Sequence, residues 1–433
     1  MIASVLFGGG GSRYGLANLA VQLTALGALA FHRRAFVDFW ANSPLSLKGL
    51  VALSLLLPTL FLIPLPPGIW TMLPGRDLVA IAQELTGGIG WSSASVDPIR
   101  TLLALTALIT PLAVLVIGWG ARRDQLITAG WLVVLLGLAN VMIGIVQVTS
   151  NGAAGLLYPE NPMPGVLFGT FANRNSAGLF LVGCLALASF LPAPRQIGRA
   201  ALAARIGICV LLVLAIVLTR SRTAIVLALL PLAMASLRLI AARTAGSRSN
   251  QSSSGRAKWA SLGVAALLIG TVASIGVAGS GRIGEVVERF QSDRTDARAF
   301  IWEDASYAAS RYWPVGAGFG TFDDVFQIDE SLENITQKRA GRAHNDYLEV
   351  AIEAGLPGIL LVAGWIFLLA WLSWKARISE DKWIAWSGSI ALLAIALQSI
   401  TDYPLRNHTL LAFAALALVM LARFGVPRKK VQQ

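Results

Sequence analysis

Long apolar runs, separated by short polar links, dominate the chain. A helix needs about 20 apolar residues to cross a hydrocarbon core of ~30 Å, and the recurring runs have this length. They predict eleven membrane-spanning helices, at residues 15–31, 49–65, 100–118, 126–147, 177–192, 206–219, 223–240, 259–279, 356–374, 383–401 and 409–423. The first dozen residues, MIASVLFGGGGS, leave a twelfth, shortened span open. The pattern therefore predicts an all-α polytopic membrane protein with 11–12 transmembrane helices.

The composition agrees with this pattern. Of the 433 residues, 55% are hydrophobic and only 13% are charged, and the mean hydropathy is +0.66. Soluble domains carry about 25% charged residues, so most of this surface must face lipid. We expect one integral membrane domain over residues 1–433, with membrane lipids as its surroundings.

The net charge of +12 does not indicate nucleic-acid binding, because the basic residues lie in short links between apolar runs. More than half of the Lys and Arg residues fall in one alternating set of links, which includes Arg122, Arg123 and the C-terminal tail. The positive-inside rule places this set in the cytoplasm. The C-terminus is then cytoplasmic, and no spacing among the three histidines and two cysteines predicts a metal site.

The opposite side carries the long links, and the largest covers residues 280–355, between the spans at 259–279 and 356–374. Within it, RIGEVVERFQ and DARAFIWEDASYAASR are typical of helices, and WPVGAGFGTF is typical of a turn. We expect this periplasmic loop to carry part of an active site.

The stretch RAHNDYLEVAIEAGLPG closes that loop. Asn345 suits a helix N-cap, and Gly355 and Pro357 indicate a stop and restart of the helix. His344 would then precede a helix N-terminus near the membrane surface. One interpretation is a histidine that merely caps the helix; the other is a proton-transfer group, since histidine changes charge near neutral pH.

Two arginines, Arg220 and Arg222, stand between adjacent apolar runs in LAIVLTRSRTAIVLALL. A charge at membrane depth is costly unless it is paired or reaches water, so the pair either extends to lipid headgroups or marks a site. Arg298 lies four residues before Trp302 on an expected helix, where guanidinium and indole can share one face.

Four further polar residues stand at span ends. Asp402 and Arg406, in TDYPLRNHT, are interpreted first as a structural ion pair. Asn173 and Asn175, in FANRNSAG, either cap the following helix or bind sugar hydroxyls.

Arginines, one histidine and a structured loop on the outer face suit a particular chemistry. Arginine binds phosphate through a planar fork, and no nucleotide-binding motif occurs in the sequence. A sugar donor outside the membrane would therefore arrive as a lipid-linked diphosphate. Its leaving group needs charge neutralisation, while an acceptor hydroxyl benefits from a general base, for which His344 is the candidate.

The stretch RAHNDYLEVAIEAGLPG also resembles the hallmark of the O-antigen ligase and O-antigen polymerase superfamily, whose pattern is close to H-N-x-[YF]-L-[EQ] followed by E-x-G-x-x-G. Weaker similarities span roughly residues 60–410 in chain order: PLPPGIW, GTFANRNSAG, TRSRTA, Arg298 to Trp302 with PVGAGFGTF, and TDYPLRN.

The resemblance implies a metal-independent, inverting glycosyltransferase of the bacterial inner membrane, with no cofactor. It would move a glycan from undecaprenyl diphosphate to an acceptor hydroxyl on the periplasmic face. Arg222 and Arg298 would bind the diphosphate, and His344 would be the base. The candidate substrate-binding residues are Arg220, Arg342, Asn345, Tyr347, Asn173 and Asn175.

The acceptor is not encoded in these motifs. We take an O-antigen ligase, with lipid A-core as acceptor, as the first interpretation. A polymerase that joins lipid-linked repeats is the alternative, followed by a protein O-oligosaccharyltransferase. A transporter of lipid-linked sugars would need polar groups along a path through the bilayer, whereas the polar groups here gather on one face.

Overall fold

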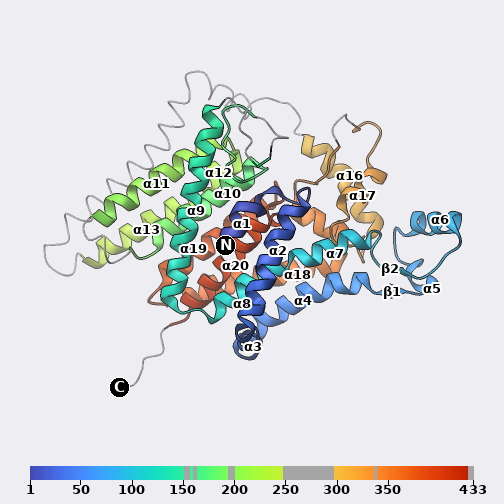
Figure 1. Cartoon of the computed structure of the whole chain (residues 1–433), viewed down its shortest axis with the longest axis horizontal. Coiled ribbons are helices and arrows are strands. Elements are labelled where there is room, and N and C mark those ends of the chain that lie inside the picture. Colours follow the sequence, from blue (N-terminus) through green and yellow to red (C-terminus); the bar gives the residue numbers. More distant parts are fainter. Residues whose placement is uncertain (151–156, 159–162, 194–199, 247–296, 336–338, 428–433) are drawn as a thin grey trace.

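The computed structural model describes residues 1–433 except for 151–156, 159–162, 194–199, 247–296, 336–338 and 428–433. In this part of the chain nearly all regular structure is helical (Figure 1). The elements are α1 (Ile2–Phe7), η1 (Gly8–Gly10), α2 (Gly15–Phe31), α3 (Arg33–Asn42), α4 (Leu45–Leu62), β1 (Pro64–Leu65), α5 (Pro67–Trp70), α6 (Asp77–Thr86), β2 (Ser92–Ser93), α7 (Pro98–Ala107), α8 (Ile109–Gly120), α9 (Arg123–Thr149), α10 (Arg174–Phe190), α11 (Ala200–Leu218), α12 (Arg222–Leu227), α13 (Leu229–Gly246), α16 (Ala297–Tyr312), α17 (Phe322–Asp329), α18 (Asp346–Ala376), α19 (Lys382–Gln398), η3 (Pro404–Arg406) and α20 (His408–Phe424).

The expected polytopic membrane fold is confirmed. Six apolar helical segments among the described residues are long enough to cross a membrane, α2 and α3 form a further candidate bent by 78°, and α10, α19 and α20 are shorter apolar helices. The span expected at 259–279 and the helix expected at RIGEVVERFQ lie outside the described residues. Every other expected span coincides with one of these apolar segments. The first dozen residues form α1 and η1, and the six-residue α1 is too short to cross a membrane by itself.

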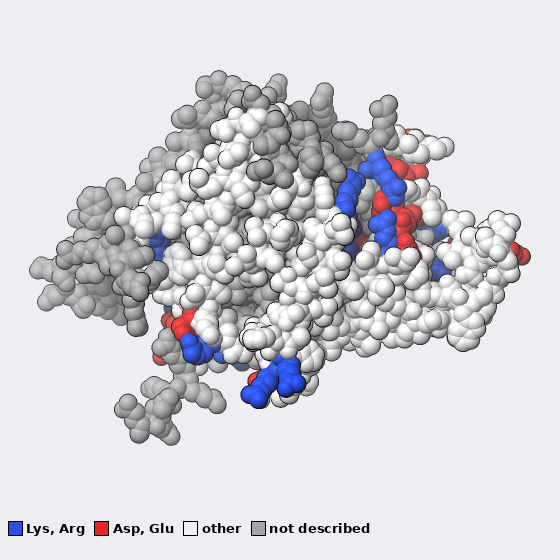
Figure 2. All heavy atoms as spheres, in the orientation of Figure 1, with Lys and Arg blue, Asp and Glu red and all other residues white. Residues whose placement is uncertain are grey.

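Charged side chains gather at the ends of the apolar helices. Figure 2 shows Lys, Arg, Asp and Glu gathered at opposite ends of the visible face, with an almost uncharged surface between them. α10 and α20 lie at the centre of the body and are buried along almost their whole length. Small residues let the helices approach here: a Cβ on Gly183 would lie 2.3 Å from the ring of Phe413.

A cap of short elements covers one end of the bundle, as expected for the long links. The helix expected at DARAFIWEDASYAASR is confirmed as α16, and α17 follows it. Strands β1 and β2 pair antiparallel, and the segment between them contains α5 and α6. This segment lies beside α16 and α17 (Figure 1). Buried Arg76 joins the two parts by donating to the carbonyl of Gly316 at 2.7 Å, and burial lowers the pKa of this guanidinium to about 10.

The cap is joined to the bundle at a break in α18. Pro357 has no N–H, so the carbonyl of Glu353 loses its usual helical donor, and Gly318 N donates to it instead at 2.8 Å. Ala317 N donates in the same way to Ile352 O, and Leu356 N turns to Pro314 O. Gly355 makes the break possible with φ +53° and ψ −143°, so the expected stop and restart is confirmed.

We predict that Gly355→Ala weakens the fold. A Cβ at this position would lie 2.1 Å from Pro314 O, and its positive φ is strained for any L side chain, by about 1–3 kcal/mol before the clash is counted. The thermal unfolding midpoint of the detergent-solubilised protein should fall well below that of the wild type. Gly49→Ala on α4, where a Cβ meets nothing within 4 Å, is the matched control. Equal midpoints for the two variants would contradict this account of the break.

Candidate active site

His344 faces a carboxylate at the end of the bundle that carries the cap. Its Nδ1 lies 3.3 Å from Oδ1 of Asp402, which is buried, while the His344 side chain is 34% exposed. The ring of Tyr403 lies 5.1 Å from the imidazole, and burial, followed by the charge of Asp402, raises the pKa of that phenol to about 12. Because the buried carboxylate of Asp402 faces Nδ1, the second ring nitrogen of His344, Nε2, is the one left for a substrate.

The backbone at His344 is held on both sides. His344 has φ +52°, an uncommon conformation for a residue other than glycine. Next to it, Ala343 N donates to Oε1 of Glu349 at 3.0 Å, and Ala343 O accepts from the indole of Trp302 at 2.8 Å. Asn345 then caps α18, as expected: its Oδ1 accepts from the backbone N–H groups of Tyr347 and Leu348. The strained peptide is therefore fixed by its neighbours.

A buried charge cluster lies directly beneath this peptide. Arg406 contacts Asp346 at 3.4 Å, Glu349 at 3.1 Å and Glu353 at 2.9 Å. Burial alone would lower the pKa of Arg406, but Glu353, Glu349 and Asp346 outweigh it and raise the pKa, so the guanidinium stays charged. The expected pair between Asp402 and Arg406 is wrong: α18 brings three acidic side chains to Arg406, and Asp402 turns instead to His344.

Asn173 lies on the other side of Asp402. Its amide Nδ2 lies 3.2 Å from Oδ2 of Asp402, and its Oδ1 accepts from Asn175 N at 2.8 Å. The expected N-cap of α10 is confirmed, and the same side chain also holds the carboxylate that faces His344. The carbonyl of Asn175 accepts from Gln398 at 2.9 Å, which ties α10 to the end of α19.

The hairpin that carries Arg220 and Arg222 reaches the same region. Thr223 Oγ1 lies 3.4 Å from Thr401 Oγ1, one residue from Asp402. Arg222 is exposed at the first position of α12, whereas Arg220 is half-buried with φ +52°. A Cβ on Gly165 would lie 3.1 Å from the Arg220 guanidinium, so this side chain points toward the segment before α10.

The remaining candidates divide into two groups. Arg298 is half-buried in the first turn of α16, four residues before the Trp302 that contacts Ala343. Arg342 instead turns into the charge cluster, where it contacts Glu349 at 3.1 Å and donates to Ser12 at 2.7 Å. Tyr347 donates its hydroxyl to Ala396 O at 2.8 Å. The structure thus brings Asp402, Asn173, Tyr403 and Trp302 to His344, with the arginine-bearing hairpin close by.

Asp402 and Glu349 are the contributions that the sequence interpretation missed. Asp402 is the sole acidic residue between α19 and α20, and the predicted topology puts it at the same end of the bundle as His344. This shared position is the sequence signal that could have predicted their contact. Among the described residues, no three His, Cys, Asp or Glu side chains are grouped to hold a metal ion. Metal independence stays a prediction.

Residues 207–363 match the family model Wzy_C, described as O-Antigen ligase. The matched segment begins in α11, ends within α18, and includes Arg222, Arg298 and His344. No curated protein is a significant match to the chain. The family match covers less than half of the chain, agrees with the motifs that resemble the O-antigen ligase superfamily, and supports glycosyl transfer of the ligase or polymerase type.

We predict that Arg406→Met destabilises the protein most at neutral and alkaline pH. Removing one partner of a buried ion pair typically costs about 3–5 kcal/mol, and here it would leave Asp346 and Glu353 without their cation, while Glu349 keeps Arg342. Lowering the pH protonates carboxyl groups and removes the uncompensated charge, so the deficit should shrink between pH 8 and pH 5. Thermal unfolding midpoints at the two pH values measure this.

Arg339→Met is the control, because this arginine is 52% exposed in its pair with Asp323 and surface pairs contribute about 0–1 kcal/mol. A deficit for Arg406→Met that does not change with pH would argue against the stranded-carboxylate explanation.

Proposed function

We propose that the protein transfers a glycan from a polyprenyl-diphosphate donor to an acceptor hydroxyl at this site, with His344 as general base. The observation that carries the proposal is the contact between His344 Nδ1 and the buried Asp402 carboxylate. If Nδ1–H donates to Asp402, Nε2 is left with a lone pair on the exposed side.

The reaction then has a simple balance. The acceptor oxygen attacks the anomeric carbon, its proton passes to Nε2 of His344, and the bond from the anomeric carbon to the diphosphate oxygen breaks. The diphosphate leaves with the electron pair. Attack opposite the leaving group inverts the anomeric configuration, and the resulting imidazolium is stabilised by Asp402.

The leaving diphosphate gains negative charge as the bond breaks. Arg222 and Arg298 are the proposed binding partners, because a guanidinium offers paired donors that match phosphate oxygens. Arg222 is exposed beside the Thr223–Thr401 contact, and Arg298 lies one turn from the Trp302 that contacts Ala343. Arg220, Asn173 and Asn175 lie on the same side as proposed glycan-binding groups.

Other candidates take a supporting role. Asn345 caps α18, Tyr347 contacts Ala396, and Arg342 contacts Glu349, so each has a structural partner. We propose that these three residues shape the site. We also propose that the site lies on the periplasmic side of the inner membrane. A ligase with a lipid A-core acceptor is the proposed activity, and a polymerase is the alternative.

His344→Ala should abolish transfer while leaving the unfolding midpoint near that of the wild type, because the His344 side chain is one-third exposed. General-base catalysis contributes about 10²–10⁴ in rate.

Asp402→Asn keeps the shape but removes the charge that stabilises the imidazolium, so kcat should fall while KM for the donor changes little. Wild-type turnover by a folded His344→Ala protein would refute the base assignment.

Transfer by the purified protein tests the function directly. Undecaprenyl-diphosphate-linked glycan is supplied as donor, with lipid A-core and a second donor molecule as rival acceptors. A ligase extends the lipid A-core, whereas a polymerase lengthens the lipid-linked glycan. Product on neither acceptor, from a protein with a wild-type unfolding midpoint, would contradict the proposal.

A further inference from the structure

Two arginines meet at the end of α10 that lies away from the candidate active site. α10 begins beside Asp402, and its 17 residues extend about 25 Å from there. At its far end, Nη1 of Arg205 lies 3.4 Å from the carbonyl oxygen of Ser189, and Nη1 of Arg238 lies 3.5 Å from the same oxygen. Arg205 also donates to Leu191 O. Two positive charges from α11 and α13 therefore share one carbonyl.

Neither of these guanidinium groups has a carboxylate partner in the part of the chain that the structure describes. Asp381, on the link before α19, pairs with Arg123 instead. Between Glu160 and Glu285 the sequence holds twelve Lys and Arg residues and no Asp or Glu, so α10, α11 and α13 carry no acidic side chain of their own. Because like charges repel, the two arginines need a counter-charge from another source.

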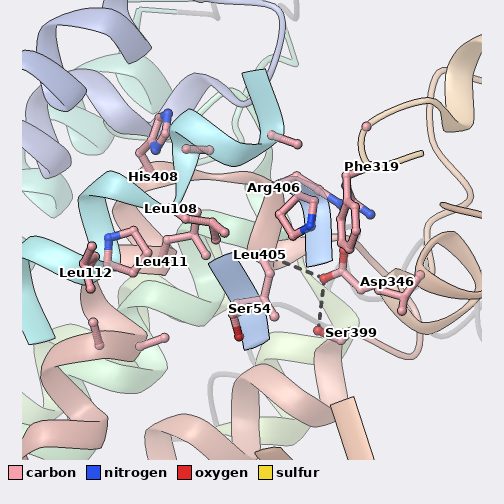
Figure 3. Close-up of a pocket in the computed structure, with 18 of the residues that line it drawn as sticks. Ser54, Leu108, Leu112, Phe319, Asp346, Ser399, Leu405, Arg406, His408 and Leu411 are labelled. Carbon is pink, nitrogen blue, oxygen red and sulfur yellow. Dashed lines mark hydrogen bonds and ion pairs between the residues drawn. The ribbon is translucent and has the colours of Figure 1, made fainter. Parts of the chain in front are cut away.

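The Arg406 cluster shows how the same chain compensates a buried guanidinium with its own acids. Figure 3 shows Arg406 and Asp346 together on one side of a large apolar pocket, and Glu353 lies 2.9 Å from the same arginine. Arg205 and Arg238 are half-buried, and no acid of the described residues reaches them. A charge near the membrane is costly unless it is paired or reaches water, so this end of the bundle suits an anionic ligand.

Two stacked aromatic rings hold Arg238 in place. Phe190 and Trp383 lie 6.1 Å apart with an interplanar angle of 9°, and the guanidinium carbon of Arg238 lies 5.9 Å from the first ring and 5.7 Å from the second. Nζ of Lys382 also lies 5.7 Å from the Trp383 ring. The rings attract these cations without neutralising them, because an aromatic ring has no net charge.

The surroundings of the two arginines are apolar. They lie near the adjacent ends of two candidate membrane spans, Ala201–Leu218 and Arg222–Ala241. Leu202 on α11 is 38% exposed, and Leu237 and Ile240 on α13 are each 56% exposed. Charge at the end of a span, flanked by exposed aliphatic side chains, fits a ligand that has both an anionic headgroup and hydrocarbon chains.

We propose that this end of the bundle binds an anionic phospholipid, with its phosphate between Arg205 and Arg238 and its acyl chains along α11 and α13. Each guanidinium carries five N–H donors, so donors remain for phosphate oxygens after the contacts with the carbonyls. Lys382 adds a third positive charge. The lipid belongs to the leaflet opposite the candidate active site, where it supplies the missing counter-charge and joins α10, α11, α13 and α19.

Binding of chain-labelled fluorescent phosphatidylglycerol to the full-length protein in zwitterionic detergent tests this site. Arg205→Gln and Arg238→Gln should each weaken binding by about tenfold, because each removes a charge from the headgroup. Arg377→Gln is the matched control: this arginine also donates to a carbonyl, Trp374 O at 3.0 Å, and lies over an aromatic ring, but it is exposed. The control variant should bind like the wild type.

Competition separates a lipid headgroup from a free anion. Unlabelled phosphatidylglycerol should displace the probe, whereas phosphatidylcholine and inorganic phosphate at the same concentration should not. Displacement by inorganic phosphate would identify a site for free anions, and displacement by phosphatidylcholine would identify an unselective apolar surface. Equal loss of affinity in all three variants would indicate a general effect of net charge. Each of these outcomes would overturn the proposal.

A second measurement uses only the wild-type protein and therefore holds even if a substitution prevents folding. Phosphatidylglycerol should raise the thermal unfolding midpoint in detergent more than phosphatidylcholine does, because a ligand that binds only the folded state stabilises it. Equal midpoints with the two lipids would contradict the proposal. Neither measurement depends on glycosyl transfer, so the proposed function can fail while this lipid site stands.

Discussion

The ion cluster centred on Arg406 holds the parts of the site together. One guanidinium joins the hairpin before α20 to three carboxylates of α18, and Arg342 brings the preceding loop to the same carboxylates. Glu349 also accepts from the peptide next to His344. A buried cation among acids is tolerated only when each charge is compensated, so the position of the imidazole depends on this compensation.

Much of the architecture could be predicted because it follows from local chemistry. A run of about 20 apolar residues has few alternatives to a membrane helix, and α2, α4 and α9 appear near the expected positions. The cap at Asn345 and the break at Gly355 also follow from the residues themselves, since each reflects a backbone requirement that few side chains meet.

The pairing of side chains across the bundle could not be predicted in the same way. Asp402 and Arg406 are one turn apart, and their opposite charges made a local pair the simplest interpretation. In the structure, Arg406 meets three acids that lie more than fifty positions earlier in the chain, and Asp402 meets His344. Such choices depend on helix packing and desolvation, which sequence spacing does not record. The role of Trp302 was missed for the same reason, because its partner is a carbonyl in a distant loop.

The break in α18 has a mechanical consequence. Because the carbonyls of Ile352 and Glu353 accept from residues 317 and 318, the first turns of α18 are tied to the cap across the break. We therefore expect changes in bilayer thickness or lateral pressure to tilt the segment after Gly355 while His344 keeps its place beside Asp402.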